Sequence, residues 1–213
     1  MDSMRLRHIP GAEEEIASSR WVYRSPEEVK QDLPSPLYLE IGMGKGGFII
    51  ESAKAHPDIC YIGIEMYESV MIKATRRLDR MEEDERPSNL HFIRMDARDI
   101  GDYFPESSVD RIYLNFSDPW PKTRHAQRRL ESEQFLRRFY PILKPGALIE
   151  FKTDNRELFD FALTEYDKAG FSLVFSTYDL HADAEAMKDN IMTEYEKKFS
   201  AKGNRICKYI IKR

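Results

Sequence analysis

Apolar residues along the chain follow two patterns, short continuous runs and a helical spacing, and the two patterns alternate. The short runs predict buried strands at residues 37–41, 60–64, 90–95, 110–116 and 147–153. The helical spacing predicts helices that begin near residue 48 and at about residues 69–80, 132–140 and 156–169. Strands that alternate with helices form a parallel sheet covered on both faces, so we predict a doubly wound α/β fold.

The end of the chain departs from this alternation. Residues 171–177 and 206–211 are predicted strands, but the polar segment 178–205 between them has no helix-length apolar pattern. We therefore expect these two strands to pair antiparallel at one edge. The prediction is a single Rossmann-like domain at residues 34–213. It has a mostly parallel seven-stranded sheet with an antiparallel C-terminal edge pair and helices on both faces.

Residues 1–33 show little strand pattern, although Trp21, Val22 and Tyr23 could anchor a short element. Four arginines make the segment loosely basic: Arg5, Arg7, Arg20 and Arg24. We interpret it as a partly ordered N-terminal leader, because chain ends are often loose. A dedicated RNA-binding arm is the alternative.

Composition narrows the class of protein. The 213 residues suit one domain, 41% of them are hydrophobic, and a net charge of −4 argues against general coating of nucleic acid. No apolar run approaches the roughly 18 residues of a membrane helix, and the polar N-terminus is no secretory signal. Cys60 and Cys207 match no metal-binding spacing. We therefore expect no membrane contact, no metal and a reduced, cytoplasmic setting.

A glycine-rich string follows the first predicted strand: Leu-Glu-Ile-Gly-Met-Gly-Lys-Gly (39–46). Glycine tolerates φ > 0 and lets a ligand approach the backbone, so this string predicts a nucleotide-binding turn. Gly42, Gly44 and Gly47 also match G-x-G-x-x-G, the pattern of dinucleotide sites. The turn by itself leaves both classes of cofactor open.

Acidic residues stand at or just past the ends of five predicted strands: Glu40, Glu65, Asp96, Asp118 and Asp154. Open α/β sheets bind ligands at this edge, although Asp96 and Asp154 are equally well interpreted as helix caps. Glu65 is placed to bind ribose hydroxyls, and Asp96 to accept from an adenine amino group. Glu40 would repel a pyrophosphate but attract an ammonium or a sulfonium. A cationic adenosine cofactor is favoured, and only Lys45 argues the other way.

The fourth strand leads into Asn-Phe-Ser-Asp-Pro-Trp-Pro-Lys (115–122). Pro119 and Pro121 fix φ and restrict the residues before them, so this loop should hold Asp118 and Trp120 stiffly over the cofactor. Six basic residues face only two acidic ones between positions 122 and 138. Such a run is usually a solvated helix face, but beside a rigid aromatic loop at the ligand edge a strip that contacts phosphates is the favoured interpretation.

The Asp-Pro-Trp-Pro-Lys string (118–122) with the Arg-His-x-x-Arg-Arg that follows it (124–129) resembles the bacterial tRNA (guanine-N7)-methyltransferase family. Further strings agree with this family: the glycine string (39–46), Tyr-Ile-Gly-Ile-Glu (61–65), Phe-Lys-Thr-Asp-Asn (151–155) and Asn-Ile-Met-Thr-Glu-Tyr-Glu-Lys-Lys-Phe (190–199). Together they extend from about residue 37 to the C-terminus.

The resemblance implies a class I methyltransferase fold and methyl transfer from S-adenosyl-L-methionine to N7 of a guanosine in the tRNA variable loop. The expected cofactor-binding residues are Glu40, Gly42, Gly44, Glu65, Asp96 and Asp118, of which Asp118 is also the expected catalytic residue. The expected contacts of the target nucleotide are Lys122, Asp154, Thr193, Glu194, Tyr195 and Glu196. The expected RNA contacts are Arg124, His125, Arg128 and Arg129. A homodimer is a further expectation.

The chemistry of guanine agrees with this set of residues. N7 carries a free lone pair at neutral pH, so the reaction needs no general base, only alignment of N7 with the methyl group at roughly 3–3.5 Å. Asp118 and Asp154 either stabilise the growing positive charge or grip the guanine edge. Trp120 or Tyr195 could stack on an exposed base, although Trp120 is equally well interpreted as a packing residue. Without the resemblance, residues 193–196 are better interpreted as the start of a solvated helix. A nicotinamide-dependent oxidoreductase and a non-catalytic RNA-binding module are the rival interpretations.

Overall fold

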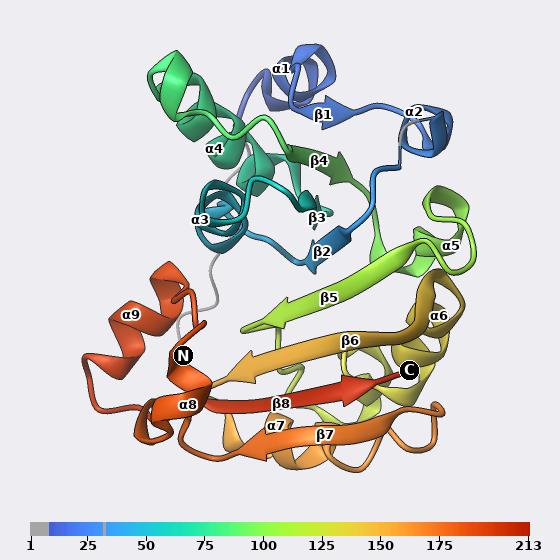
Figure 1. Ribbon diagram of the computed structural model, residues 1–213, viewed down its shortest axis with the longest axis vertical. Helices are drawn as coiled ribbons and strands as arrows, with labels where there is room; N and C mark the ends of the chain where they lie inside the picture. Colours follow the sequence, from blue (N-terminus) through green and yellow to red (C-terminus); the bar gives the residue numbers. More distant parts are fainter. Residues whose placement is uncertain (1–8, 32) are drawn as a thin grey trace.

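A computed structural model describes residues 9–31 and 33–213, and within these ranges the chain forms an eight-stranded sheet of order β1-β4-β3-β2-β5-β6-β8-β7 (Figure 1). The seven predicted strands are present: β2 (Leu37–Ile41), β3 (Cys60–Glu65), β4 (Leu90–Arg94), β5 (Val109–Asn115), β6 (Leu143–Thr153), β7 (Ser172–Thr177) and β8 (Cys207–Lys212). The additional strand, β1 (Val22–Tyr23), pairs with β4 at one edge.

The direction of the strands sets the position of the site. The strands from β1 to β6 are parallel, so their carboxyl ends meet along one edge. β8 pairs antiparallel with both β6 and β7, which confirms the predicted antiparallel pair and the fold class. The arrowheads of β5 and β6 point toward the side of the molecule where α9 (Glu194–Ser200) lies (Figure 1).

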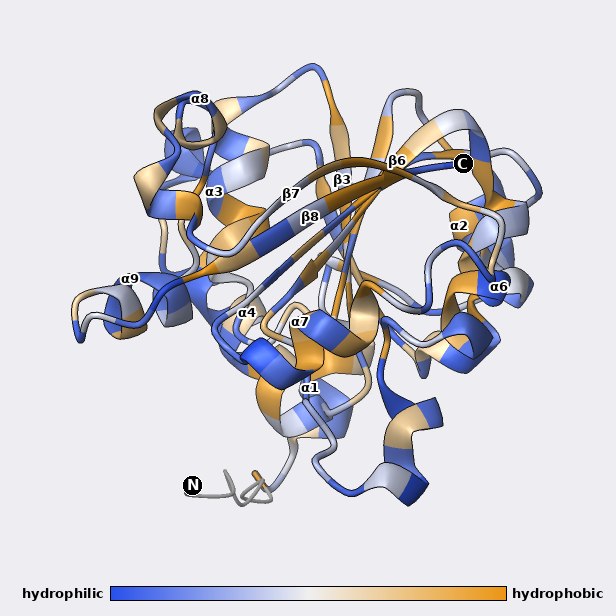
Figure 2. Cartoon of the chain, turned by 90° about the horizontal axis from the view of Figure 1, so that it is seen from below, coloured by the Kyte–Doolittle hydropathy of each residue, from blue (hydrophilic) through white to orange (hydrophobic). Residues whose placement is uncertain are grey.

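Helices cover both faces of the sheet, each over its own apolar core. One core packs on three helices: α1 (Ala12–Ser18), α3 (Gly47–Ala55) and α4 (Glu68–Asp79). The other packs on four: α2 (Pro26–Gln31), α5 (Ile100–Tyr103), α6 (Glu133–Ile142) and α7 (Arg156–Ala162). Figure 2 shows the hydrophobic colours concentrated in the strands between these layers. The central strands are thus covered on both faces and form a packed platform for the carboxyl edge of the sheet.

Two helices end differently from the prediction. α6 continues through Pro141 to Ile142, since a proline in the last turn removes only a terminal backbone bond. α7 stops at Ala162 instead of near residue 169, because the backbone then tightens into i→i−3 bonds such as Thr164 N to Phe161 O at 2.9 Å. The polar segment 178–205 contains two short helices, α8 (Ala184–Met187) and α9. The first was not predicted, whereas α9 begins at the possible helix start at residues 193–196.

The described part of the N-terminal segment packs on the sheet. α1 lies against α4, where Glu15 pairs with Arg76 at 2.6 Å and the Trp21 indole N–H donates to Asp79 at 2.8 Å. Two of its arginines make contacts within the segment: the Arg20 guanidinium lies over the Trp21 ring, and Arg24 donates to the Ala17 carbonyl. Arg5 and Arg7 lie outside the described residues. None of the helices in the described ranges is both long and apolar enough to span a bilayer.

Candidate active site

The five predicted acids lie along the carboxyl edge of the parallel strands. Asp96 follows β4, Glu65 ends β3, Glu40 lies in β2, Asp118 follows β5 and Asp154 follows β6. Because the strand order is β4-β3-β2-β5-β6, these residues are arranged in that order across the edge. The sequence pattern therefore correctly predicted that all five residues lie at the carboxyl edge of the sheet.

The glycine turn between β2 and α3 is shaped by backbone that only glycine adopts easily. Gly42, Gly44 and Gly46 have φ of 75°, 58° and 72°. A Cβ at Gly46 would lie 2.9 Å from the Ala74 Cβ, so close packing on α4 also requires glycine there. Glu65 closes the turn by accepting from Gly44 N at 3.1 Å. The turn is therefore preformed for close approach of a ligand.

Two further backbone N–H groups donate to the other carboxylate oxygen of Glu65. Its Oε1 accepts from Met66 N at 2.9 Å and from Tyr67 N at 3.1 Å. Burial raises the pKa of Glu65 although these bonds oppose the shift, and the nearby Asp118 charge raises it further. Glu65 and Asp118 thus lie near enough for their charges to interact.

Glu40 is the most informative acid in the site. Its side chain is 2% exposed, Oε1 accepts from the Asn115 amide at 2.9 Å, and Oε2 has no hydrogen-bond partner in the described part of the chain. Burial raises the pKa of Glu40 to about 8. A buried carboxyl with a free oxygen is costly unless a donor or a cation completes it. This favours a positively charged ligand over a pyrophosphate.

The capping alternative holds for Asp96 but not for Asp154. Asp96 accepts from Arg98 N at 2.9 Å as N-cap of a short 3₁₀ turn, and the Arg98 guanidinium at 2.7 Å lowers its pKa. Asn155, not Asp154, caps α7 by accepting from Leu158 N at 2.9 Å. Asp154 instead accepts from the Asn204 amide at 2.9 Å and remains half-buried. Its carboxylate is thus available at the edge.

The loop 116–121 carries backbone strain at two aromatic residues. Phe116 has φ of 53° and Trp120 has φ of 40°, values that bulky residues rarely adopt. The loop leaves Asp118 exposed beside Glu65. The Phe116 ring lies 4.8 Å from that of Tyr195, which is 42% exposed. The loop therefore carries an exposed carboxylate at Asp118, and its Phe116 supports the exposed ring of Tyr195.

The basic strip, residues 124–129, contains both solvent-exposed arginines and one arginine that is bonded to the loop. Arg124 is exposed, and the Arg128 guanidinium lies 5.1 Å over the Trp120 ring, which also contacts His125 at 5.7 Å. Arg129 is turned inward, where it donates to the carbonyls of Pro119 at 2.9 Å and Trp120 at 3.2 Å. Arg129 thus holds the loop, whereas Arg124 and Arg128 present charge to solvent.

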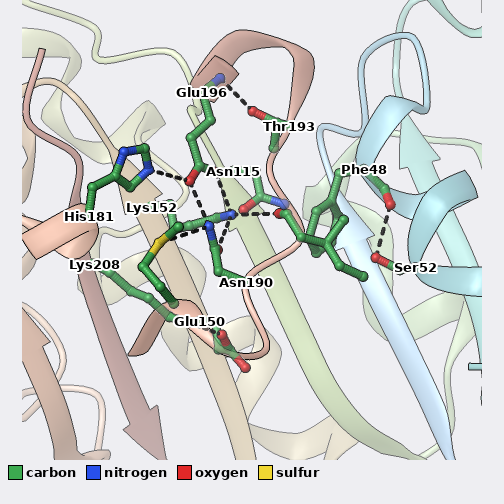
Figure 3. Close-up of polar contacts among 12 residues, drawn as sticks. Phe48, Ser52, Asn115, Glu150, Lys152, His181, Asn190, Thr193, Glu196 and Lys208 are labelled. Atoms are coloured by element: carbon green, nitrogen blue, oxygen red, sulfur yellow. Dashed lines mark hydrogen bonds and ion pairs between the residues drawn. The ribbon is translucent and has the colours of Figure 1, made fainter. Parts of the chain in front are cut away.

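The predicted nucleotide-binding string on α9 is partly internal. Thr193 caps α9 by accepting from Glu196 N at 2.8 Å, and Glu194 pairs with Arg77 at 2.8 Å. Glu196 is 0% exposed and accepts from Lys152 at 2.7 Å, Asn190 at 2.8 Å and His181 at 2.9 Å (Figure 3).

These contacts give Glu196 the role of an internal anchor for α9. By contrast with the buried Glu196, the side chains of Tyr195 and Lys122 are exposed to solvent. Burial raises the pKa of Tyr195, and the charge of Asp154 raises it further, so these two predicted nucleotide contacts lie near each other. In the described ranges no group of three His, Cys, Asp or Glu side chains is placed to hold a metal.

Three residues that build the site were not predicted from the sequence. Asn115 holds Glu40, Lys152 holds Glu196, and Glu131 accepts a hydrogen bond from Ser117 beneath the loop. A lysine inside a predicted buried strand is a usable signal, because such a charge needs a partner. The partners themselves lie far away in sequence, and no local pattern identifies them.

Known structures place the fold in a class. The chain superimposes on an antibiotic-related methyltransferase with a TM-score of 0.65 at 17% identity, over 90% of this chain and 94% of that chain. The 16S rRNA methyltransferase KamB gives 0.63 at 15% identity, over 87% and 91%. With its antiparallel strand inserted next to the sheet edge, the protein has a class I methyltransferase fold.

The family is narrower than this class. A family model described as “Putative methyltransferase” matches residues 34–209. The chain is 48% identical to the tRNA (guanine-N(7)-)-methyltransferase of Lachnoclostridium phytofermentans, over 97% of each chain. It is 46% identical to that of Geobacillus sp. (strain WCH70), over 98% of this chain and 96% of the relative. The chain belongs to the tRNA (guanine-N7)-methyltransferase family.

Proposed function

We propose that the protein transfers a methyl group from S-adenosyl-L-methionine to N7 of a guanosine in the variable loop of tRNA, in the cytoplasm. The observation that carries this proposal is near-full-length similarity to proteins named for this reaction, at 44–48% identity. The arrangement of charge supports it, since acids stand along the carboxyl edge and the segment that follows β5 and Asp118 carries the exposed Arg124 and Arg128. The homodimer stays a prediction.

The residues at the glycine turn suit S-adenosyl-L-methionine. Glu40 offers a buried carboxyl oxygen without a partner, and Glu65 lies against the turn with backbone donors on both oxygens. The glycine backbone leaves room for close approach. We assign Glu40, Glu65 and the turn to this ligand, together with Asp96 and Asp118. When bound, the ligand supplies an electrophilic methyl group on a sulfonium.

The residues outside the turn serve the base and the RNA. Guanine N7 attacks through its own lone pair, so the protein has to align the base and accommodate the positive charge that the base acquires. The exposed carboxylate of Asp118 and the half-buried one of Asp154 can stabilise that charge. Tyr195, which stacks on Phe199 at 4.0 Å, is an exposed ring that can contact the base. Lys122, Arg124 and Arg128 reach the phosphates.

The direct test is incubation of the protein with unmodified tRNA and methyl-labelled S-adenosyl-L-methionine, followed by nucleoside analysis. We expect the label in 7-methylguanosine from the variable loop. Label in another nucleoside would change the assigned reaction. The absence of any label, with tRNA still bound, would favour a non-catalytic RNA-binding module.

The nicotinamide alternative is disfavoured by Glu40. Glu40 is a buried carboxyl two residues before the first glycine of the turn, and an ionised carboxylate there would repel a pyrophosphate held at the start of α3. Equilibrium dialysis separates the two ligands: we expect retention of S-adenosyl-L-methionine and none of NAD. Retention of NAD alone would assign the site to a dinucleotide.

Glu40 also predicts a pH-dependent affinity. Its pKa of about 8 means that the carboxyl is largely neutral at pH 6, whereas a cationic ligand needs the carboxylate. We expect affinity for S-adenosyl-L-methionine in the wild type, relative to Glu40→Gln, to rise by up to about tenfold per pH unit from pH 6 to 8. Calorimetry on both proteins measures this ratio and cancels the titration of the ligand. A constant ratio would show that Glu40 does not face the ligand.

The raised pKa of Glu40 also predicts that replacing this residue stabilises the protein at alkaline pH. The folded pKa of Glu40 lies above its ordinary value of 4.5, so its stabilising contribution is complete below that value and is lost as the pH rises through about 8. Glu40→Gln should therefore unfold at an equal or higher temperature than the wild type at pH 8.5. A lower temperature would mean that the carboxylate is needed for folding.

The basic strip predicts the salt dependence of tRNA binding. Arg124→Ala with Arg128→Ala removes two exposed charges and leaves Arg129 on the loop. We expect weaker binding and a slope of log Kd against log salt that is shallower by about 2. Filter binding over a salt series measures it. The control is Lys30→Ala with Lys54→Ala, two exposed charges in the last turns of α2 and α3. Equal slopes in both double variants would make the strip ordinary surface.

A further inference from the structure

The strained loop that carries Asp118 is held from one short segment of the chain. Phe116 and Trp120 keep positive φ, and such backbone persists only where surrounding contacts fix it. Arg129 fixes one end of the loop through the Pro119 and Trp120 carbonyls. Two residues further along, Glu131 fixes the other end by accepting from the Ser117 hydroxyl. Ser117 stands between the strained Phe116 and Asp118.

Glu131 is an unusual residue for a buried anchor. It is 0% exposed, and its Oε2 and the buried Tyr209 hydroxyl have no hydrogen-bond partners in the described part of the chain. Burial raises the pKa of Glu131 to about 7, although Ser117 and Arg129 oppose the shift. An apolar residue of similar size would be cheaper to bury, so this carboxyl is retained at a cost to stability.

We propose that Glu131 is a positioning residue, which through Ser117 fixes the loop that presents Asp118 for methyl transfer. The inference rests on the proposed function and deepens it. Glu131 is fully buried and accepts from the Ser117 hydroxyl, so we assign it to the loop and not to the RNA or the methyl donor. It acts on the geometry of the loop, so its loss should lower turnover without weakening the binding of either substrate.

The test replaces each half of the contact. Glu131→Met removes the acceptor at similar volume, and Ser117→Ala removes the donor at a half-buried position. We expect kcat to fall by about tenfold or more in both, with the Kd values for S-adenosyl-L-methionine and tRNA within about threefold of the wild type. Glu131→Met should melt at an equal or higher temperature, because an orphaned polar atom is gone. A merely structural residue would lose stability and activity together.

Conservative variants and a matched serine complete the test. Glu131→Gln and Ser117→Thr keep an acceptor and a hydroxyl, so they should retain most of the kcat. Ser108→Ala is the control, since Ser108 is also half-buried and lies at the other end of β5, where its hydroxyl donates to the Pro105 carbonyl at 2.8 Å. Should Glu131→Met and Ser117→Ala turn over like Ser108→Ala, the inference fails while the proposed function stands. A wild type that never methylates tRNA would overturn both.

Discussion

The Asp118→Ala protein is expected to fold normally and to transfer methyl groups about 10²–10³ times more slowly than the wild type, the usual cost of removing one preorganised electrostatic group. Asp118 is exposed at the tip of the loop, so its removal leaves both cores intact. The same carboxylate lies near Glu65, and its loss removes negative charge from the place where positive charge gathers during transfer. The chemical step should therefore suffer more than folding or tRNA binding.

Single-turnover methylation with saturating substrates measures this effect, and thermal unfolding checks the fold. The matched control is Asp58→Ala, an exposed aspartate that precedes β3 at the opposite edge of the sheet. We expect the control to keep wild-type turnover. A rate in Asp118→Ala within about threefold of the control would remove Asp118 from the catalytic role.

The second large effect is expected from the buried ion pair of Lys152 and Glu196. Replacing Lys152 by Met leaves Glu196 buried without its cation, which should lower the free energy of unfolding by about 3–5 kcal/mol. Burial opposes the charged form of both groups, yet the Lys152 charge together with the bonds from His181, Lys152 and Asn190 lowers the pKa of Glu196 overall. Loosening α9 should also lower activity, because α9 carries Tyr195.

A double-mutant cycle shows whether Lys152 and Glu196 stabilise each other or only fill space in the core. Lys152→Met with Glu196→Met replaces the pair by two apolar side chains, and it should cost less stability than Lys152→Met alone. Denaturant unfolding of the two single variants and the double variant gives the coupling energy. Additive costs would show that Lys152 and Glu196 do not stabilise each other.

The sequence predicted the carboxyl edge well because the information is local. An acid at the end of a strand is placed by the strand itself, and parallel strands share one edge, so the positions of Glu40 and Glu65 followed from periodicity alone. The antiparallel end of the sheet followed in the same way, from two apolar runs without a helix between them. These features could be predicted because they depend on neighbouring residues in the sequence and not on distant contacts.

The anchors of the site could not be predicted in this way. Lys152 and Glu196 are 44 residues apart, and the only buried residue of α9 is that glutamate, so the helix has no apolar stripe to reveal it. The inward turn of Arg129 likewise depends on the loop carbonyls it meets, not on the charge run that contains it. Asp96 could be a ligand or a cap on sequence alone, and only the contact with Arg98 shows the cap.

One pair of substrates tests the central claim most directly. A tRNA transcript with guanosine in the variable loop is compared with an identical transcript that carries 7-deazaguanosine there, in which carbon replaces N7. With labelled S-adenosyl-L-methionine, the account predicts a methyl group on the first transcript and none on the second, at equal binding of both. Equal labelling of the two transcripts, or of neither, would contradict it.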